Sequence, residues 1–139
     1  MLVVEDEDAV RTLMRETLGR AGYRVIEAAN GVEALEAATA HPARMDLLVT
    51  DLVMPGMSGL ELADRLLSVR LGLRVLCISG YAEAALAGAG APERAVPMLR
   101  KPFAMEALVR RVRETLDAPA PVSAGGRDRG NVRLGPARS

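Results

Sequence analysis

Short apolar runs alternate along this chain with longer stretches in which apolar residues recur every three or four positions. The runs have the length and composition of strands, at residues 2–4, 23–28, 46–51, 74–79 and 97–102. Helical spacing covers residues 8–21, 30–40, 59–70 and 104–116, with a weaker stretch at 82–87. Strand and helix in repeated alternation predict an α/β fold: a five-stranded, doubly wound parallel sheet with helices on both faces.

Composition limits the possible function. The chain has 139 residues, which predicts one main domain, and half of them are hydrophobic but only 2% aromatic, so the core must be aliphatic. Lys+Arg and Asp+Glu balance at 18 each, which gives no global reason to expect binding to nucleic acid or to an acidic membrane. A single cysteine, Cys77, excludes an intramolecular disulfide and fits a reducing compartment.

Neither a secretory signal nor a membrane span is expected. The start, MLVVEDED, meets acid at its fifth residue, and no apolar run approaches the ~20 residues that a bilayer-spanning helix needs. We therefore expect a cytoplasmic protein. The domain is expected to cover residues 1–117, and residues 118–139, rich in Pro, Gly and Arg, are expected to form a disordered tail.

Several of the predicted strands end at polar residues. The run LLVTD stops at the carboxylate of Asp51, and the other strands end at Glu5-Asp6, Ser79 and Lys101-Pro102. Parallel strands place their carboxyl ends at one edge of the sheet, where functional groups of such folds gather. Glu5, Asp6, Asp51, Ser79 and Lys101 are therefore expected to converge.

Three neighbouring carboxylates repel one another unless a cation compensates them. A set of oxygen ligands without a Cys or His pair favours Mg²⁺, Ca²⁺ or Mn²⁺, and a sparse set that leaves room for phosphate oxygens fits Mg²⁺ best. Lys101 and the Ser79 hydroxyl are suitable partners for a phosphoryl group. Asp51 is then the nucleophile that takes up phosphoryl as an acyl phosphate.

With these residues in place, the segment from Met1 to about Asp117 resembles the receiver domains of two-component response regulators. The resemblance rests on the acidic pair, TDLVMPGMSG, Ser79 and LRKPF. It implies a flavodoxin-like sheet of strand order 2-1-3-4-5, one of the common orders of doubly wound folds. It also implies that Asp6 binds the metal directly, Glu5 through water, and Val53 through its main-chain carbonyl. Asp51 is then the phosphoacceptor.

The resemblance extends to the switch. Ser79 matches the switch hydroxyl, and Lys101 matches the phosphate-binding lysine, whose bond to Pro102 is commonly cis in the family. Met98 stands where many members carry an aromatic residue that is coupled to the switch hydroxyl, so this chain departs from the family pattern at that position. The Glu-Asp pair is similar to that of receivers fused to hybrid histidine kinases, and the short first strand favours a piece of a larger protein.

The implied function is a phosphorylation-dependent switch in phosphorelay signal transduction. A histidine kinase or a histidine phosphotransfer protein would donate phosphoryl to Asp51, and the face formed by helix 4, strand 5 and helix 5 would respond. Homodimerisation through that face is possible. No enzyme activity beyond self-dephosphorylation is expected, and the chain is either a stand-alone receiver or a piece of a larger protein such as a hybrid kinase.

Two other function classes stay open. A receiver fold used only for docking would not respond to phosphorylation. An aspartyl-phosphate hydrolase would carry a second Asp two residues after the nucleophile, where this chain has Val53.

Single residues also have plainer interpretations. Glu5 and Asp6 could cap the first helix, and a serine such as Ser79 is common at a strand end. Cys77 is expected in the core and His41 at the surface.

Overall fold

The five expected strands form one parallel sheet in the order β2-β1-β3-β4-β5, as predicted. The computed structural model describes residues 1–70, 72–80 and 97–118. The helix expected at 82–87 and the tail expected after residue 118 lie outside these residues. The strands are β1 (Leu2–Val4), β2 (Ile26–Ala28), β3 (Leu47–Asp51), β4 (Arg74–Ser79) and β5 (Met98–Arg100).

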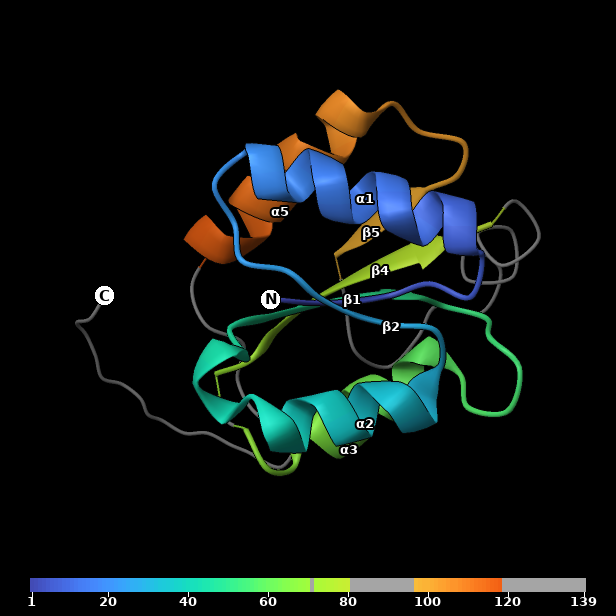
Figure 1. Ribbon diagram of the computed structural model, residues 1–139, viewed down its shortest axis with the longest axis vertical. Helices are drawn as coiled ribbons and strands as arrows, with labels where there is room; N and C mark the ends of the chain where they lie inside the picture. Colours follow the sequence, from blue (N-terminus) through green and yellow to red (C-terminus); the bar gives the residue numbers. More distant parts are fainter. Residues whose placement is uncertain (71, 81–96, 119–139) are drawn as a thin grey trace.

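Helices cover both faces of the sheet. Helices α1 (Asp8–Arg20) and α5 (Met105–Asp117) lie on one side, and α2 (Gly31–Ala40) and α3 (Gly59–Leu67) lie on the other (Figure 1). A short 3-10 turn, η1 (Pro42–Arg44), follows α2. This three-layer arrangement is the predicted α/β fold.

Each face of the sheet has its own aliphatic core, because side chains alternate along a strand. Leu2, Val4 and Leu48 point toward α2 and α3, and Val3, Leu47 and Val49 point toward α1 and α5. All five residues of β3 are buried, as expected for the central strand of a sheet covered on both sides.

Local signals fix where the helices begin and end. Asn30 caps α2 by accepting from the Glu33 amide at 2.9 Å, while Glu33 accepts from the Ala29 amide at 2.9 Å, a reciprocal capping pair. Ser58 caps α3 by accepting from the Glu61 amide at 3.1 Å. After α1, Gly22 has a φ of +101°, which only glycine adopts readily, so the chain turns there.

Three elements, β2, β5 and α3, are shorter than the sequence pattern predicts, and β5 spans Met98–Arg100 rather than residues 97–102. Strand β2 begins at Ile26 rather than residue 23, because β1, its partner among the described strands, has three residues and pairs from Leu2↔Ile26 onward. Helix α3 ends at Leu67 rather than residue 70. There Arg70 turns away to donate to the carbonyls of Pro42, at 2.7 Å, and Ala38, at 3.4 Å.

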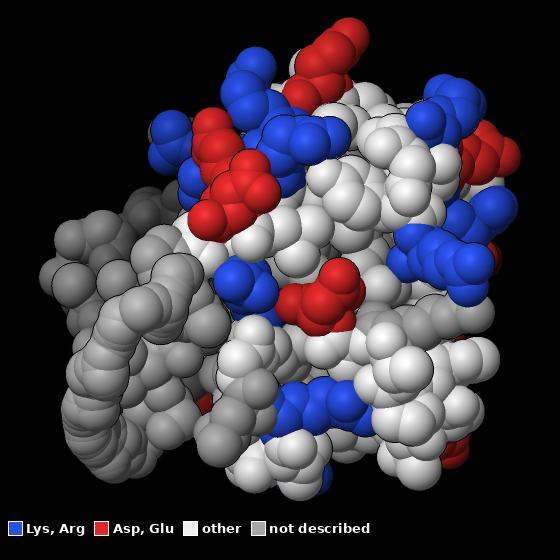
Figure 2. All heavy atoms as spheres, turned by 90° about the vertical axis from the view of Figure 1, so that its left-hand side faces the viewer, with Lys and Arg blue, Asp and Glu red and all other residues white. Residues whose placement is uncertain are grey.

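The surface carries charges of both signs. On the side from which β1 begins, acidic and basic side chains are interspersed, and neither sign forms a large patch among the described residues (Figure 2). This mixing agrees with the equal numbers of acidic and basic residues in the sequence.

Candidate functional site

The alternation of side chains along three strands leads to one cluster of charges. In β1, β3 and β5 the positions that face α1 and α5 are apolar inside the sheet: Val3, Val49 and Leu99 belong to the same core. Two positions further along each strand, on the same face, come Glu5, Asp51 and Lys101. Charged groups therefore replace aliphatic ones where the strands leave the core.

The three charges lie in direct contact. Lys101 Nζ is 3.3 Å from Glu5 Oε1 and 3.3 Å from Asp51 Oδ1. Glu5 is fully buried and Asp51 is 4% exposed, whereas 32% of the Lys101 side chain is open to solvent. The lysine thus forms the solvent side of the cluster, and its bond to Pro102 is cis, as the family resemblance implies.

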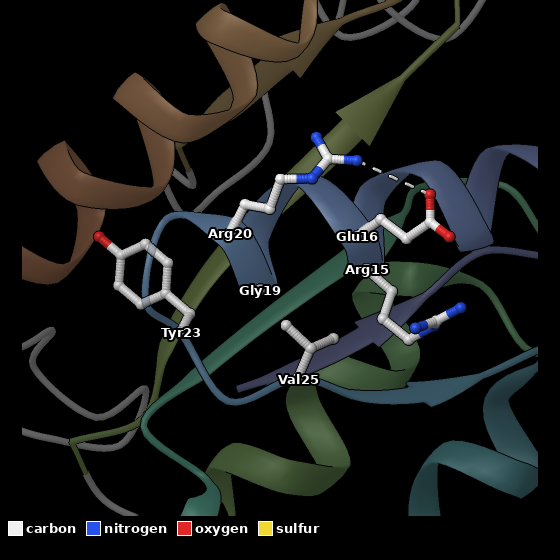
Figure 3. Close-up of a pocket in the computed structure, with 6 residues that line it drawn as sticks. All are labelled: Arg15, Glu16, Gly19, Arg20, Tyr23 and Val25. Carbon is white, nitrogen blue, oxygen red and sulfur yellow. Dashed lines mark ion pairs between the residues drawn. The ribbon is translucent and has the colours of Figure 1, made fainter.

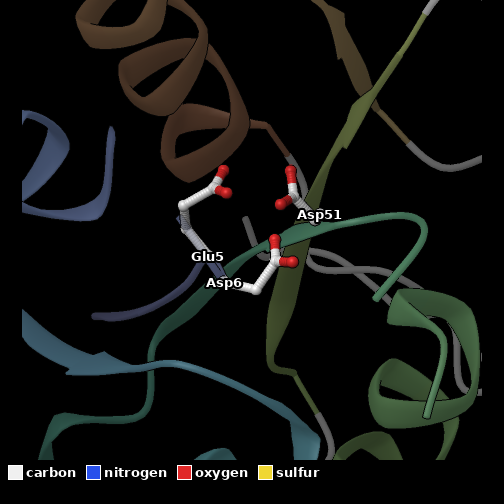
Figure 4. Close-up of side chains that lie close together, drawn as sticks. All are labelled: Glu5, Asp6 and Asp51. Atoms are coloured by element: carbon white, nitrogen blue, oxygen red, sulfur yellow. The ribbon is translucent and has the colours of Figure 1, made fainter. Parts of the chain in front are cut away.

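Asp6 completes the predicted acidic set. Glu5, Asp6 and Asp51 each offer a carboxylate oxygen, and these oxygens all lie within 4.8 Å of one another. The three side chains point toward one another from the end of β1 and the end of β3 (Figure 4). Asp6 is exposed, so the carboxylate cluster can be reached from solvent on that side.

The helix-capping interpretation describes only part of what Glu5 does. Its Oε2 accepts from the Glu7 amide at 3.0 Å, next to the start of α1, but the N-cap residue is Glu7 itself, which makes no side-chain cap bond. Glu5 Oε1 is buried and has no hydrogen-bond partner among the described residues, although Lys101 Nζ lies 3.3 Å away. One carboxylate oxygen therefore supports the loop, and the other faces the cluster.

The cluster changes the acidity of its members. Burial, followed by the adjacent Glu5 carboxylate, raises the pKa of Asp51 from 3.8 to about 8, and Lys101 offsets only part of this rise. Partial burial acts to lower the pKa of Lys101, but Asp51 and Glu5 outweigh it, so the pKa of Lys101 is raised. Asp51 is thus short of positive charge even beside the lysine.

The residues fit a divalent cation of the magnesium type. The donor set consists of carboxylate oxygens, the ligands that hard cations prefer, and it includes a buried Glu5 oxygen that accepts no hydrogen bond from the described residues. The raised pKa of Asp51 shows the same need for positive charge. These observations favour Mg²⁺ over zinc, which takes mainly nitrogen and sulfur ligands.

The loop after β3 holds Asp51 through its main chain. The Gly59 amide donates to the Leu52 carbonyl at 2.8 Å, so the first turn of α3 lies against the strand end. A Cβ atom added at Gly59 would lie 2.0 Å from the main-chain oxygen of Asp51. The last glycine of MPGMSG is therefore required by a close approach of main chain to main chain.

The remaining predicted residues are Ser79, Val53 and Met98. Ser79 is buried at the end of β4, one residue beyond Ile78, which pairs with Asp51. Within the described part of the chain its hydroxyl makes no hydrogen bond to Asp51 or Lys101, but its carbonyl accepts from the Lys101 amide at 2.8 Å. The Val53 side chain is 59% exposed, and Met98 is half-buried at the start of β5.

Two residues with plain interpretations behave as expected. Cys77 is fully buried in the core, and burial raises the pKa of its thiol to about 11, which makes it unreactive. His41 is exposed at the end of α2.

Arg11 is a neighbour of the cluster that no sequence motif marks. Its Nη1 donates to the main-chain carbonyl of Glu5 at 2.8 Å. The spacing to Asp8 suits a helical ion pair, but a contact with a main-chain carbonyl leaves no trace in the sequence pattern.

A shallow groove of about 600 Å³ lies elsewhere on the molecule. It is lined by the second half of α1 and by the segment that leads into β2, with Arg15, Arg20 and Tyr23 around it (Figure 3). It contains none of the residues that the sequence predicts for the site.

Comparison with known proteins identifies similar chains. Residues 1–113 match the family model described as response regulator receiver domain. The chain is 40% identical over 117 residues to the sensor kinase CckA of Brucella abortus. The aligned region covers 84% of this chain and 12% of that protein. The chain is 36% identical to the response regulator receiver protein CpdR of the same organism, over 85% of this chain and 97% of that protein.

Solved structures agree with the sequence relatives. The receiver domain of the hybrid histidine kinase CckA superposes with a TM-score of 0.70 at 35% identity, covering 84% of this chain and 97% of that one. The chain thus spans a small part of the sensor kinase and nearly all of CpdR. No helix in the described ranges is long and apolar enough to cross a membrane.

Proposed function

Since the chain belongs to the response regulator receiver domain family, a family of phosphoacceptors in phosphorelay signalling, we propose that Asp51 is its phosphoacceptor. One observation carries the proposal. Asp51 is a buried carboxylate at the end of the central strand, within 3.3 Å of the Lys101 ammonium and beside two further acids. Burying a carboxylate beside other carboxylates costs free energy, so its presence at this position favours a chemical role.

In the proposed reaction an Asp51 carboxylate oxygen attacks the phosphorus of a phosphohistidine on a partner protein. The P–O bond forms as the P–N bond breaks, and the imidazole leaves with the electron pair and takes a proton from solvent. Asp51 must be unprotonated to attack, and its pKa of about 8 leaves most of it protonated at neutral pH. Added positive charge at the cluster therefore favours the reactive form.

We assign a magnesium site to the same cluster. Asp6, Asp51 and the main-chain carbonyl of Val53 would hold the ion, with Glu5 acting through water. When bound, Mg²⁺ supplies neutralising charge to the phosphoryl oxygens. Lys101 supplies the second positive charge, because its side chain is partly exposed and its ammonium has donors that can turn from the acids to a phosphoryl oxygen.

Ser79 and the strand that carries Lys101 form the proposed switch. The Ser79 hydroxyl would donate to the new phosphoryl group, and the hydrogen bond between the Lys101 amide and the Ser79 carbonyl couples the ends of β4 and β5. Movement of these ends would bias β5 and α5 toward an active arrangement. Met98 stands where many family members carry an aromatic residue, and substitution of Met98 tests whether it takes part in the switch.

The partner class follows from the chemistry. A histidine kinase or a histidine phosphotransfer protein presents the phosphohistidine that the reaction requires. A homodimer through the face formed by helix 4, strand 5 and helix 5 is a further proposed contact. The chain turns over no separate substrate in this scheme; hydrolysis of its own aspartyl phosphate resets it. It functions alone or as the receiver of a longer protein, as in the sensor kinase that it resembles.

The test is labelling by a small phosphodonor. The protein is incubated with Mg²⁺ and phosphoramidate, and intact mass is measured for wild type, Asp51→Asn and the control Asp117→Asn, which changes an exposed acid at the end of α5. We expect one added phosphoryl in wild type and control, none in Asp51→Asn, and none with a chelator. Labelling of Asp51→Asn at another residue would contradict the assignment. No labelling of folded wild type would favour a docking module.

A further inference from the structure

Arg11 joins three elements beside the acidic pair. Its Nη1 donates to the Glu5 carbonyl at 2.8 Å, its Nη2 contacts Asp8 Oδ1 at 2.6 Å, and its Nε donates to Glu27 Oε1 at 3.2 Å. Only 16% of the Arg11 side chain is exposed. Because the guanidinium is planar and rigid, these bonds fix the end of β1, the start of α1 and β2 relative to one another.

The contact with the Glu5 carbonyl has a specific mechanical meaning. That carbonyl belongs to the peptide unit between Glu5 and Asp6, and a peptide unit is planar. The Glu5 amide, on the other side of the residue, donates to the Ala28 carbonyl at 3.1 Å. With the carbonyl also held, the peptide that joins the two acids cannot rotate freely. Arg11 therefore sets the direction in which both carboxylates leave the main chain.

Arg15 is a natural comparison one turn further along α1. Its Nε lies 2.8 Å from Glu27 Oε2, so both arginines share the same glutamate. Arg15 is 40% exposed and lines the groove of Figure 3, and none of its described contacts is to Glu5. Arg15 thus shares the link to β2 but not the link to the acidic pair.

We propose that Arg11 is a positioning residue for magnesium binding and phosphoryl transfer, which acts by holding the peptide unit between Glu5 and Asp6. The inference rests on the proposed function and extends it to a residue outside the acidic cluster. Arg11 touches neither the cation nor the phosphoryl group in this scheme. Its effect is on the magnesium concentration that the reaction needs, more than on the stability of the fold.

The test compares Arg11→Met with Arg15→Met. The initial rate of phosphoramidate labelling is measured against Mg²⁺ concentration, which separates the half-saturating concentration from the maximal rate. NMR titration with Mg²⁺ alone measures binding without chemistry, and urea unfolding measures stability. Since partners that orient metal ligands are worth about 10–100-fold in metal affinity, we expect Arg11→Met to raise the half-saturating Mg²⁺ concentration about tenfold. Arg15→Met should change it less than about twofold.

Two further variants keep the test decisive if Arg11→Met is poorly folded. Arg11→Lys retains the charge and one donor and should recover part of the lost Mg²⁺ affinity. Glu27→Gln weakens the shared contact of both arginines but leaves the bond to Glu5, so it should behave like Arg15→Met. Recovery in Arg11→Lys with normal Mg²⁺ affinity in Glu27→Gln supports the inference. Equal affinities in all the folded variants would overturn it.

The same experiment separates this inference from the proposed function. If wild type is labelled and binds Mg²⁺ while the Arg11 and Arg15 variants agree, only the role of Arg11 is wrong. If folded wild type neither binds Mg²⁺ nor is labelled, the proposed function is wrong and the role of Arg11 is overturned with it.

Discussion

Strand β3 contains two regions with opposite requirements. Its first four residues, Leu47–Thr50, are buried and uncharged and hold the two cores together. Its last residue, Asp51, is equally buried but carries a carboxylate beside that of Glu5. The backbone pairing with β4 continues through Asp51 without a break, so the same sheet supports both regions.

The contrast shows that the first region stabilises the fold and that Asp51 opposes folding. Burial of aliphatic side chains stabilises the fold by about 1.5–3 kcal/mol each. A buried carboxylate near a like charge opposes folding unless something neutralises it. Substitutions in the first region should therefore lower stability, whereas neutralising Asp51 should raise stability and abolish the proposed reaction.

The largest effect is expected from Leu48→Ala. Leu48 is fully buried in the core that faces α2 and α3, so truncation leaves a cavity that costs about 3 kcal/mol in the free energy of unfolding. Urea unfolding with chelator measures it. Val69→Ala, at a side chain that is 74% exposed, is the control and should stay within about 0.5 kcal/mol of wild type. A loss below about 1 kcal/mol would show that β3 is not central to stability.

A smaller effect is expected from Gly59→Ala, and it combines a loss of stability with slower labelling. Gly59 lies against Asp51, where the two regions of β3 meet. The added methyl would overlap the Asp51 carbonyl, so the main chain must shift, at a cost of about 1–3 kcal/mol. Because that main chain carries the proposed nucleophile, phosphoramidate labelling should also slow. The control is Gly19→Ala in α1, where a methyl meets nothing within 4 Å and helix propensity should add up to about 1 kcal/mol. Normal labelling of Gly59→Ala would contradict the close-approach argument.

Much of this arrangement could be predicted from the sequence, for physical reasons. Strand ends of a parallel sheet share one edge, so polar residues after apolar runs were enough to bring Glu5, Asp6, Asp51 and Lys101 together. The acidic cluster and the lysine contacts agree with that prediction. Ser79 lies at the expected strand end, but its hydroxyl makes no hydrogen bond to Asp51 or Lys101 in the described structure.

What the sequence did not reveal depends on contacts with the main chain. The extent of β2 is set by the length of its partner strand, and its own alternating pattern predicts a longer strand. Gly59 faces a main-chain oxygen, and Arg11 binds a main-chain carbonyl. Patterns of side-chain type carry no signal for such contacts, since every residue offers the same main-chain groups.

Substitution of the proposed nucleophile should have the opposite sign to Leu48→Ala. Asp51→Asn removes one buried negative charge and leaves the pair between Lys101 and Glu5 in place. With Mg²⁺ chelated at pH 8, we expect the free energy of unfolding to rise by about 1 kcal/mol. The exposed Asp117→Asn should leave it unchanged. Destabilisation by Asp51→Asn would mean that the carboxylate is already compensated in the metal-free protein.

The pH dependence of that gain sharpens the comparison further. The folded-state pKa of Asp51, about 8, lies above the ordinary value of 3.8, so the folded protein holds a proton that the unfolded chain has released. The stabilising contribution of this proton is complete below pH 3.8 and is lost as the pH rises through about 8. In chelator, the stability gap by which Asp51→Asn exceeds wild type should therefore widen between about pH 5 and pH 8. Titrating groups that do not contact Asp51 are common to both proteins and cancel in this difference. Saturating Mg²⁺ should stabilise wild type more at pH 8 than at pH 5, because cation and proton compete for the same carboxylate. A gap that is constant or shrinks with pH would show that Asp51 is charged throughout, and that Lys101 alone meets its need for positive charge.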